Sequence, residues 1–313
     1  MRYSLRQLTY FIAAAETGSV TLAAERVSIS QPSISTAISH LEREFGVQLF
    51  IRHHALGLSL TPIGRELLTE AKKLIDQADG LYAIASEASG QVRGRLTFGC
   101  MLTLAPMVVP ELAQTFVAAY PAVEVTHTEA DHERLIDGLR RAEIDAVVTY
   151  DLNIPPGVDF LPLASLPAHV VVGEEHPFAG RTSVHLSEIA DEPLILLDLP
   201  FSRDYFLALF LKEDLTPRIH ARSVYPDVIR TMVANGYGYT LANVRPRSHV
   251  ALDGRRVVRV ALEGSHRPMV VGLAILTATR RSRLLQAFEA HCHSLFAEGN
   301  IPGMEATLTS GTA

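Results

Sequence analysis

Residues 20–45 constrain the fold of this chain more than any other stretch. Their sequence, VTLAAERVSISQPSISTAISHLEREF, fits two short helices joined by a tight polar turn. Apolar residues recur at helical spacing in the first half, and the paired alanines leave room for another helix to cross closely. These residues are Val20, Ala23, Ala24 and Val27. Ser28-Ile29-Ser30 then interrupts the period, so we predict a helix, a turn and a second helix.

The second helix is predicted to have one buried face and one polar face. Ser30 is suited to cap it, and Gln31 and Pro32 fall in its first turn, where the missing N–H of proline has no cost. The apolar stripe consists of Ile34, Ile38, Leu41 and Phe45. Off this stripe lie Ser33, Ser35, Thr36, Ser39, His40 and Arg43.

The polar face differs from an ordinary solvated helix surface, which is rich in Glu and Lys. Ser and Thr are weak helix formers, so their accumulation needs another reason. Short donors and acceptors near the start of a helix suit the major groove of DNA, where Gln pairs with adenine and Ser or Thr with phosphates or bases. On the residue pattern alone, a helical hairpin at a protein interface fits equally well.

The size and charge of the chain limit the possible functions. With 313 residues and 48% hydrophobic content, two or three domains are expected. The net charge of -6 argues against a protein that coats nucleic acid. Residues 1–60 hold five Arg against four acidic side chains, whereas 61–90 hold three basic against five acidic ones. A balance of +1 implies few phosphate contacts per subunit, so specific DNA binding would need more than one subunit.

The cysteines and the N-terminus indicate a cytoplasmic protein. Cys100 and Cys292 are the two cysteines, which is no disulfide framework and fits a reducing compartment. The start, MRYSLRQLTYF, lacks the apolar run of a signal peptide, and no stretch is apolar for long enough to span a bilayer. Cys100 is more typical of a small buried residue than of a sensor thiol.

Further elements flank the two predicted helices. An amphipathic helix precedes them and ends near Gly18, and the segment LFIRHHALGLSLTP follows with the alternation of a two-stranded wing. Arg52 near the start of the wing fits a phosphate or minor-groove contact, and an ordinary surface arginine fits as well. The adjacent histidines have no Cys or acidic partner at ligand spacing, so no metal site is predicted.

A long helix is predicted next, capped by Thr61 with Pro62 in its first position and ending near Ser89. It carries a heptad seam of Leu67, Ala71, Leu74, Ala78, Leu81, Ala85 and Ala88. One narrow stripe cannot bury itself, so the helix is predicted to pack against a second copy of the chain. Packing on the next domain of the same chain is the alternative.

The order of these elements resembles the LysR-type transcriptional regulators. The resemblance rests on Ser30-Gln31-Pro32-Ser33-Ile34-Ser35, Leu41-Glu42-Arg43-Glu44-Phe45-Gly46, Leu49-Phe50, Arg52, Leu60-Thr61-Pro62 and Gly64. The chain departs from the pattern at Thr36, where many members carry Arg. The resemblance implies a winged helix-turn-helix that binds double-stranded promoter or operator DNA, a homodimer or homotetramer, and RNA polymerase as a candidate partner.

The remainder alternates strands and helices, which indicates an α/β domain with a mainly parallel sheet. We predict a winged helix-turn-helix domain at 1–60, a linker helix for dimerisation at 61–90, an effector-binding domain at 91–300 and a disordered tail at 301–313. The resemblance implies that the third part has two α/β lobes like a periplasmic binding protein, with a ligand cleft between them.

Ligands bind beyond the carboxyl ends of strands in open α/β sheets. This rule selects Cys100 to Thr103, Thr128, Glu129, Tyr150, Asp151, Phe201 to Arg203, and Tyr225. The resemblance implies effector contacts at Met101, Leu102, Thr103, Thr128, Phe201 and Ser202. Arg203 suits a carboxylate, which favours a small organic acid, although it could instead pair with Asp204. Glu129 and Asp151 would equally suit an amine.

No enzyme signature occurs in the sequence. Gly236-Tyr237-Gly238 lacks the third glycine of a dinucleotide site, and no G-x-S-x-G, H-E-x-x-H or phosphate-binding loop is found. We predict a transcriptional regulator controlled by a small-molecule effector, with no catalytic residue, cofactor, metal or membrane partner. The alternatives are a cytoplasmic α/β enzyme with an accessory helical domain and a solute-binding protein, and the latter lacks an export signal.

Overall fold

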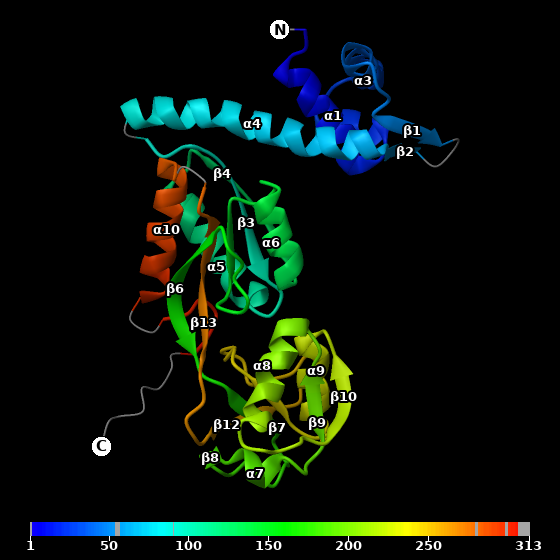
Figure 1. Cartoon of the computed structure of the whole chain (residues 1–313). Helices are drawn as coiled ribbons and strands as arrows, with labels where there is room; N and C mark the ends of the chain where they lie inside the picture. Colours follow the sequence, from blue (N-terminus) through cyan, green and yellow to red (C-terminus); the bar gives the residue numbers. More distant parts are fainter. Residues whose placement is uncertain (1, 54–56, 90, 279–280, 298–299, 306–313) are drawn as a thin grey trace. The chain divides into compact units, whose positions relative to one another are not determined.

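The computed structural model describes residues 2–53, 57–89, 91–278, 281–297 and 300–305. Within the helix at 62–89, it describes the side chains of 62–75, 77 and 78. The chain forms two compact units, one built mainly from the residues up to Gly94 and one from those after it. Figure 1 labels most of their helices and strands.

The first unit is helical with a small wing. Its elements are α1 (Leu5–Thr17), α2 (Val20–Arg26), α3 (Gln31–Phe45), β1 (Phe50–His53), β2 (Gly57–Leu60) and α4 (Pro62–Ser89). A capping box of Ser4 and Gln7 starts α1, and Gly18 ends it in the left-handed conformation. β1 and β2 pair antiparallel, which confirms the predicted wing.

The core of this unit joins all three short helices. Buried residues include Leu8, Phe11, Ala23, Ile34 and Leu41, so the alanine pair and the stripe of the second helix face inward as predicted. The first part of α4 closes this core, because Ala71 is buried in it and Leu67 and Leu68 pack against it. The predicted seam is therefore divided: Leu67 and Ala71 pack within their own chain, whereas Leu74 is 41% exposed.

Two close backbone contacts fix the wing. A Cβ at Gly57 would lie 2.4 Å from the carbonyl oxygen of Gly18, and φ of Gly57 is +87°, so only glycine fits there. The Leu58 amide donates to the same carbonyl at 2.7 Å. At the start of α4, the Thr61 hydroxyl accepts from the Gly64 amide at 2.9 Å, which confirms the predicted cap. The wing is thus held against the end of α1.

The second unit contains two separate groups of strands, which form two lobes. The first lobe has a five-stranded sheet in the order β4 (Val123–Ala130), β3 (Gly94–Met101), β5 (Ala146–Tyr150), β13 (Met269–Leu276) and β6 (Val158–Leu166). Its helices are α5 (Ala105–Ala119), α6 (His132–Arg140) and α10 (Arg283–Leu295).

Helices cover both faces of the five-stranded sheet. Phe98 on β3 contacts Phe288 of α10, which in turn contacts Phe116 of α5, so α5 and α10 share one face. Gly99 points to the other face, where an added Cβ would lie 2.7 Å from Leu135 of α6. Because β3 and β5 are parallel, their carboxyl ends lie at the same edge of this sheet.

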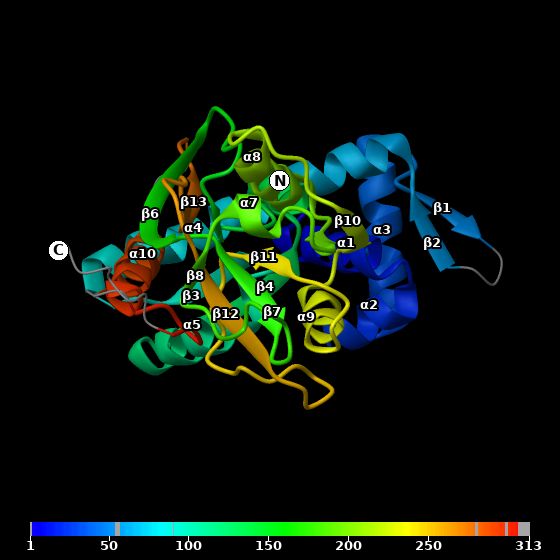
Figure 2. The same cartoon turned by 90° about the horizontal axis from the view of Figure 1, so that it is seen from below.

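The second lobe is built from the middle of this unit. One sheet has the order β11 (Thr240–Ala242), β7 (His169–Gly173), β12 (Val257–Leu262) and β8 (Ser183–Val184), and β9 (Leu194–Leu197) pairs in parallel with β10 (Ile219–Ser223). The helices are α7 (Leu186–Ile189), α8 (Pro200–Leu211) and α9 (Pro226–Ala234). In Figure 2, β7 and β12 run side by side with α9 next to them.

The prediction of a mainly parallel sheet is wrong. β13 is antiparallel to both β5 and β6, and β7 is antiparallel to both β11 and β12. The chain leaves the first lobe along β6 and returns along β13, so two long strands in one sheet must run in opposite directions. The elements α5, β6 and β12 were not predicted. In α5 the helical pattern is obscured by Pro106 and by Pro110 inside the helix.

The last described residues do not form the predicted disordered tail. Ile301 and Met304 are each 2% exposed, and Met304 forms a β-bridge with Pro246. The Gly303 amide donates to the carboxylate of Glu111 on α5 at 3.3 Å. Tail residues 306–313 lie outside the described part. In the described ranges no helix combines the length and apolar character that crossing a membrane requires.

Candidate DNA-binding surface and ligand site

The outer face of α3 is exposed as predicted. Ile34, Ala37, Ile38 and Leu41 are buried, so the opposite side of the helix faces solvent. The exposed candidates are Ser30, Gln31, Pro32, Ser33, Thr36, Ser39 and Arg43, and Ser35 is half-buried. Hydroxyls, an amide and one guanidinium therefore share a single accessible surface.

The turn before α3 sets the direction of this face. Ser28 has φ 53°, in the left-handed region, and the Ile29 amide reaches back to the Ala24 carbonyl at 2.9 Å. The Gln31 amide nitrogen donates to the Thr21 hydroxyl of α2 at 2.9 Å. Gln31 thus ties the two helices together while its side chain stays exposed.

Ser30 takes the N-cap position of α3 but does not cap it with its side chain. Its backbone is extended, and no side-chain bond to the helix amides forms. The Ser30 hydroxyl lies 2.8 Å from the Ser33 hydroxyl instead. The predicted side-chain cap is therefore wrong, because Ser33 offers a competing partner. Both hydroxyls stay on the exposed surface.

The wing is attached to α3 through Glu42. The Glu42 carboxylate accepts from the Leu49 amide at 2.9 Å and the Phe50 amide at 3.3 Å. Arg52 follows on β1, exposed and opposite Leu58. Within the described ranges neither Arg43 nor Arg52 has an acidic partner, so both guanidinium groups are available to phosphates. Of the two adjacent histidines, His53 is exposed on β1 and His54 lies outside those ranges.

Two candidate ligand residues meet at the carboxyl ends of β3 and β5. The hydroxyls of Thr103 and Tyr150 lie 2.9 Å apart, and both side chains are buried. Burial raises the pKa of Tyr150, so its phenol stays protonated. Met101 is buried beside this turn, and the Leu102 amide donates to the Ala130 carbonyl at the end of β4.

His132 is a site residue that the sequence reasoning missed. It begins α6 directly after β4, and its Nδ1 lies 3.0 Å from the Thr149 hydroxyl. Its Nε2 is buried near the backbone of Asn153 but forms no hydrogen bond of normal geometry in the described part of the chain. The ring contacts Phe201 edge to face, with centroids 5.2 Å apart, so it joins α6 of one lobe to α8 of the other. Burial lowers the pKa of His132, so the ring is neutral near pH 7.

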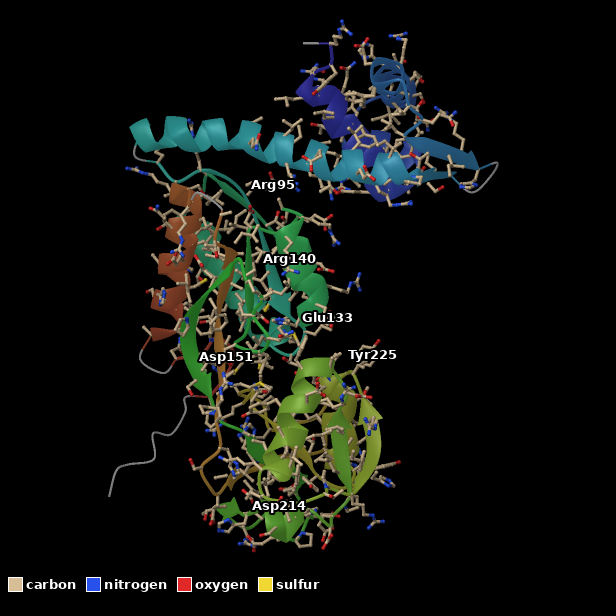
Figure 3. All side chains as sticks on the ribbon, in the orientation of Figure 1. Arg95, Glu133, Arg140, Asp151, Asp214 and Tyr225 are labelled. Atoms are coloured by element: carbon tan, nitrogen blue, oxygen red, sulfur yellow. The ribbon has the colours of Figure 1, made fainter. Side chains whose placement is uncertain are left out.

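The charged candidates already have partners. Asp151 accepts from the Val270 amide at 3.0 Å and pairs with Arg267. Figure 3 places Asp151 in the first lobe. Arg203 donates to Asp198 at 3.1 Å and to Asp204 at 3.0 Å, as the alternative interpretation of this residue stated. Each charge is balanced within the protein.

The remaining candidates lie in different surroundings. Ser202 is buried in the first turn of α8, whereas Thr128 is exposed. Thr128 lies within β4 and not after it, because that strand continues to Ala130. Tyr225 is 66% exposed at the N-cap of α9 (Figure 3). These three residues take no part in the bonds of Thr103 and His132 described above.

Two family models match the chain in the order of its two units. Residues 5–65 match the bacterial regulatory helix-turn-helix protein of the lysR family. Residues 89–297, more than half of the chain, match the LysR substrate binding domain. The chain belongs to the LysR family.

Curated relatives of this LysR-family protein are transcriptional regulators and not enzymes. The regulator CysB of Haemophilus influenzae is 28% identical over 287 residues, covering 88% of this chain and 85% of CysB. The dual regulator OxyR of Escherichia coli K12 is 28% identical over 239 residues, covering 76% and 78%. The LysR-family protein described here is a DNA-binding transcriptional regulator with an effector-binding domain.

Solved structures share the fold. HinK, a LysR family regulator from Pseudomonas aeruginosa, aligns with a TM-score of 0.65 and 35% identity, covering 94% of this chain and 98% of HinK. A full-length OxyR variant from the same organism gives 0.73 and 25%, covering 93% and 95%. These alignments confirm the predicted fold class of a helix-turn-helix unit and an α/β effector-binding unit.

Both cysteines of this LysR-family protein are buried and free. Burial raises the pKa of Cys100 on β3 and of Cys292 on α10, so both stay protonated as thiols. Because the thiolate is the reactive form, neither side chain has the environment of a reactive cysteine. The interpretation of Cys100 as a packing residue agrees with this burial.

Proposed function

We propose that the protein binds a specific operator through the outer face of α3, from Ser30 to Arg43, with Arg52 of the wing on the phosphate backbone. The exposed row of hydroxyls carries this proposal, because these groups donate to and accept from base edges in the major groove. A structure of full-length CbnR with its target DNA aligns with a TM-score of 0.66. At 21% sequence identity, this alignment supports a shared fold and nothing more.

Selection of bound duplexes from a random pool tests this proposal. We expect one recurring sequence for the wild type and a loss of enrichment in Ser33→Ala and Thr36→Ala. Gln77→Ala, an exposed position on α4, is the control and should enrich the same sequence. A pool that stays random for the wild type would contradict the proposal.

We also propose that the effector is a small organic acid bound at the carboxyl ends of β3 and β5. The buried Nε2 of His132 supports this location, because it has no well-formed hydrogen bond in the described part of the chain and a ligand can supply one. If Nδ1 accepts from Thr149, Nε2 carries the proton and donates to a carboxylate. Thr103 adds a hydroxyl at the same edge, and Phe201 adds an apolar ring.

Arg203 is a weaker anchor than the sequence suggested, since Asp198 and Asp204 already satisfy its guanidinium. Thermal-shift screening of organic acids against amines tests the charge of the effector. We expect an acid to stabilise the wild type, His132→Phe to lose that shift, and Arg203→Gln to keep most of it. Stabilisation by amines alone would contradict the proposal that the effector is an organic acid.

The division of labour along the chain is also a proposal. We assign DNA reading to 1–60, dimerisation to 61–90 and effector binding to 91–300, with action in the cytoplasm, where the DNA lies. The exposed Leu74 on α4 supports dimerisation, because an unpaired leucine on a long helix gains by packing on a copy. An effector then shifts the equilibrium between two arrangements of the dimer or tetramer by binding one more tightly.

A further inference from the structure

Three arginines surround one face of the sheet that contains β7 and β12. Arg259 of β12 lies opposite Val171 in the register, and His169, two residues earlier on β7, points to the same face. α9 covers this face closely, because a Cβ at Gly173 would lie 2.7 Å from the Val233 carbonyl oxygen. This helix carries Arg230.

The third arginine, Arg245, follows β11, which pairs with β7 on its other side. The three side chains repel one another. Burial and the charge of Arg259 lower the pKa of Arg230, and burial together with Arg245 lowers the pKa of Arg259. Burial also lowers the pKa of Arg245. The Glu305 amide donates to the Arg245 carbonyl at 2.9 Å and the Glu305 carboxylate pairs with Arg259 at 2.9 Å, so these partly buried cations lie close together.

A single glutamate offsets part of their charge. Glu305, at the end of the described chain, pairs with Arg259 at 2.9 Å and contacts His249 at 2.8 Å. Arg230 donates to the Ser248 carbonyl, and Asp227 acts on it only beyond ion-pair distance. Among the described residues the Arg245 guanidinium has no hydrogen-bond or ion-pair partner. Among the described residues, three guanidinium groups against the one carboxylate within ion-pair distance leave two positive charges in excess.

A buried histidine next to the arginines supplies a second observation. His169 is 2% exposed and lies near the backbone of Pro167, but neither ring nitrogen forms a hydrogen bond of normal geometry among the described residues. Burial and the charges of Arg245 and Arg259 lower the pKa of His169 to about 3, so the ring is neutral and one nitrogen carries a proton. A buried donor without a well-formed hydrogen bond is rare in folded proteins.

We propose that Arg230, Arg245 and Arg259 form a second ligand site, for a small oxyanion with two negative charges. Guanidinium groups bind carboxylate and phosphate oxygens in pairs, and a dianion would balance the two excess charges. Glu305 occupies part of this site as an internal counter-ion. The site is separate from the proposed effector site at Thr103 and His132 and does not depend on it.

The position of Glu305 couples this site to the first lobe. Two hydrogen bonds hold the segment that contains Glu305. The Gly303 amide donates to the carboxylate of Glu111 on α5, and the Arg247 amide donates to the Gly303 carbonyl at 3.2 Å. An anion that takes the place of the Glu305 carboxylate therefore acts on a segment bound to both lobes. The site gives the regulator a response to anions that is independent of the effector.

Calorimetric titration of the full-length protein tests the proposal, with inorganic phosphate and sulfate as probes and chloride holding the ionic strength constant. We expect one site per chain for at least one probe, and the stronger probe identifies the oxyanion class. Arg245→Gln should weaken binding at least 10-fold without changing the circular dichroism spectrum, because this guanidinium holds no described partner. Arg255→Gln, an exposed arginine elsewhere, should bind as the wild type does.

Glu305→Gln provides a test in the opposite direction. Removing the internal competitor should tighten binding of the same probe about threefold or more, whereas a merely structural Glu305 would leave it unchanged or weaker. The proposal is overturned if neither dianion binds at constant ionic strength, if Arg245→Gln binds as tightly as the wild type, or if Glu305→Gln gains no affinity.

Discussion

The hydroxyl oxygens of Thr103 and Tyr150 lie 2.9 Å apart, 5% and 1% exposed, so one buried hydrogen bond joins the turn after β3 to the end of β5. This bond holds the two strand ends where ligands bind in α/β sheets. The position of the Thr103 hydroxyl thus depends on a residue 47 positions away in the sequence.

Thr103→Val should lower the free energy of unfolding by about 1–2 kcal/mol, because it leaves the buried Tyr150 hydroxyl without this partner. Thr103→Ser keeps the hydroxyl and should lose less. Urea unfolding at pH 7 measures both variants. Equal stability of Thr103→Val and the wild type would show that the bond contributes nothing.

Arg43→Gln and Arg52→Gln should each weaken operator binding and reduce the salt dependence of the affinity. Each lost phosphate contact lowers the slope of log affinity against log salt by about 1, without changing which sequence is preferred. Titrations at several salt concentrations measure the slope. Arg255→Gln is the matched control. An unchanged slope for both Arg43→Gln and Arg52→Gln would show that neither arginine contacts a phosphate.

Most of the helix-turn-helix unit was predictable from its sequence because its signals are local. The alanine pair, the stripe from Ile34 to Leu41 and the Thr61 cap depend on residues within a few turns of one another, and the structure confirms all three. The side-chain cap of Ser30 was wrong for a local reason too, since sequence spacing does not decide between an amide and the Ser33 hydroxyl as partner.

The ligand residues were less predictable because their contacts are distant in sequence. The strand-end rule found Thr103, Tyr150 and Phe201, but not His132, whose importance arises from Thr149 on one side and Phe201 on the other. A histidine directly after a strand end, in the first turn of a helix, was the available signal. The pairing of Asp151 with Arg267, 116 positions away, has no sequence signature.

Leu74→Asp should reduce the mass of the oligomer in sedimentation. Leu74 is 41% exposed in one chain, and a carboxylate in an apolar helix seam would be desolvated on association. Gln77→Asp, exposed on the same helix but off the seam, introduces the same charge and should keep the wild-type mass. Identical masses for all three proteins would exclude α4 as the dimer contact.

Peroxide should leave the two thiols of this protein unmodified. Cys100 and Cys292 are each 0% exposed, and burial raises both pKa values. Labelling with a thiol reagent should therefore require denaturant, and Cys100→Ala with Cys292→Ala should retain DNA binding under peroxide. Rapid labelling of the native protein would contradict this expectation.

The stability of the effector-binding unit should fall on mild acidification, and His169 should account for much of the loss. Burial lowers the pKa of His169 from 6.5 to about 3, so the unfolded chain takes up a proton first as pH falls. Its stabilising contribution is thus complete above pH 6.5 and is lost as pH falls from 6.5 towards 3, by up to about 1.4 kcal/mol per pH unit.

Between pH 6.5 and 5 the wild type should therefore lose up to about 2 kcal/mol through His169. His169→Leu removes the titrating ring, so its unfolding free energy should depend less steeply on pH in the same urea series. His132, whose pKa burial also lowers, titrates in both proteins, and the difference between their slopes isolates His169. Parallel curves for the two proteins would mean that His169 takes up its proton equally in the folded and unfolded states.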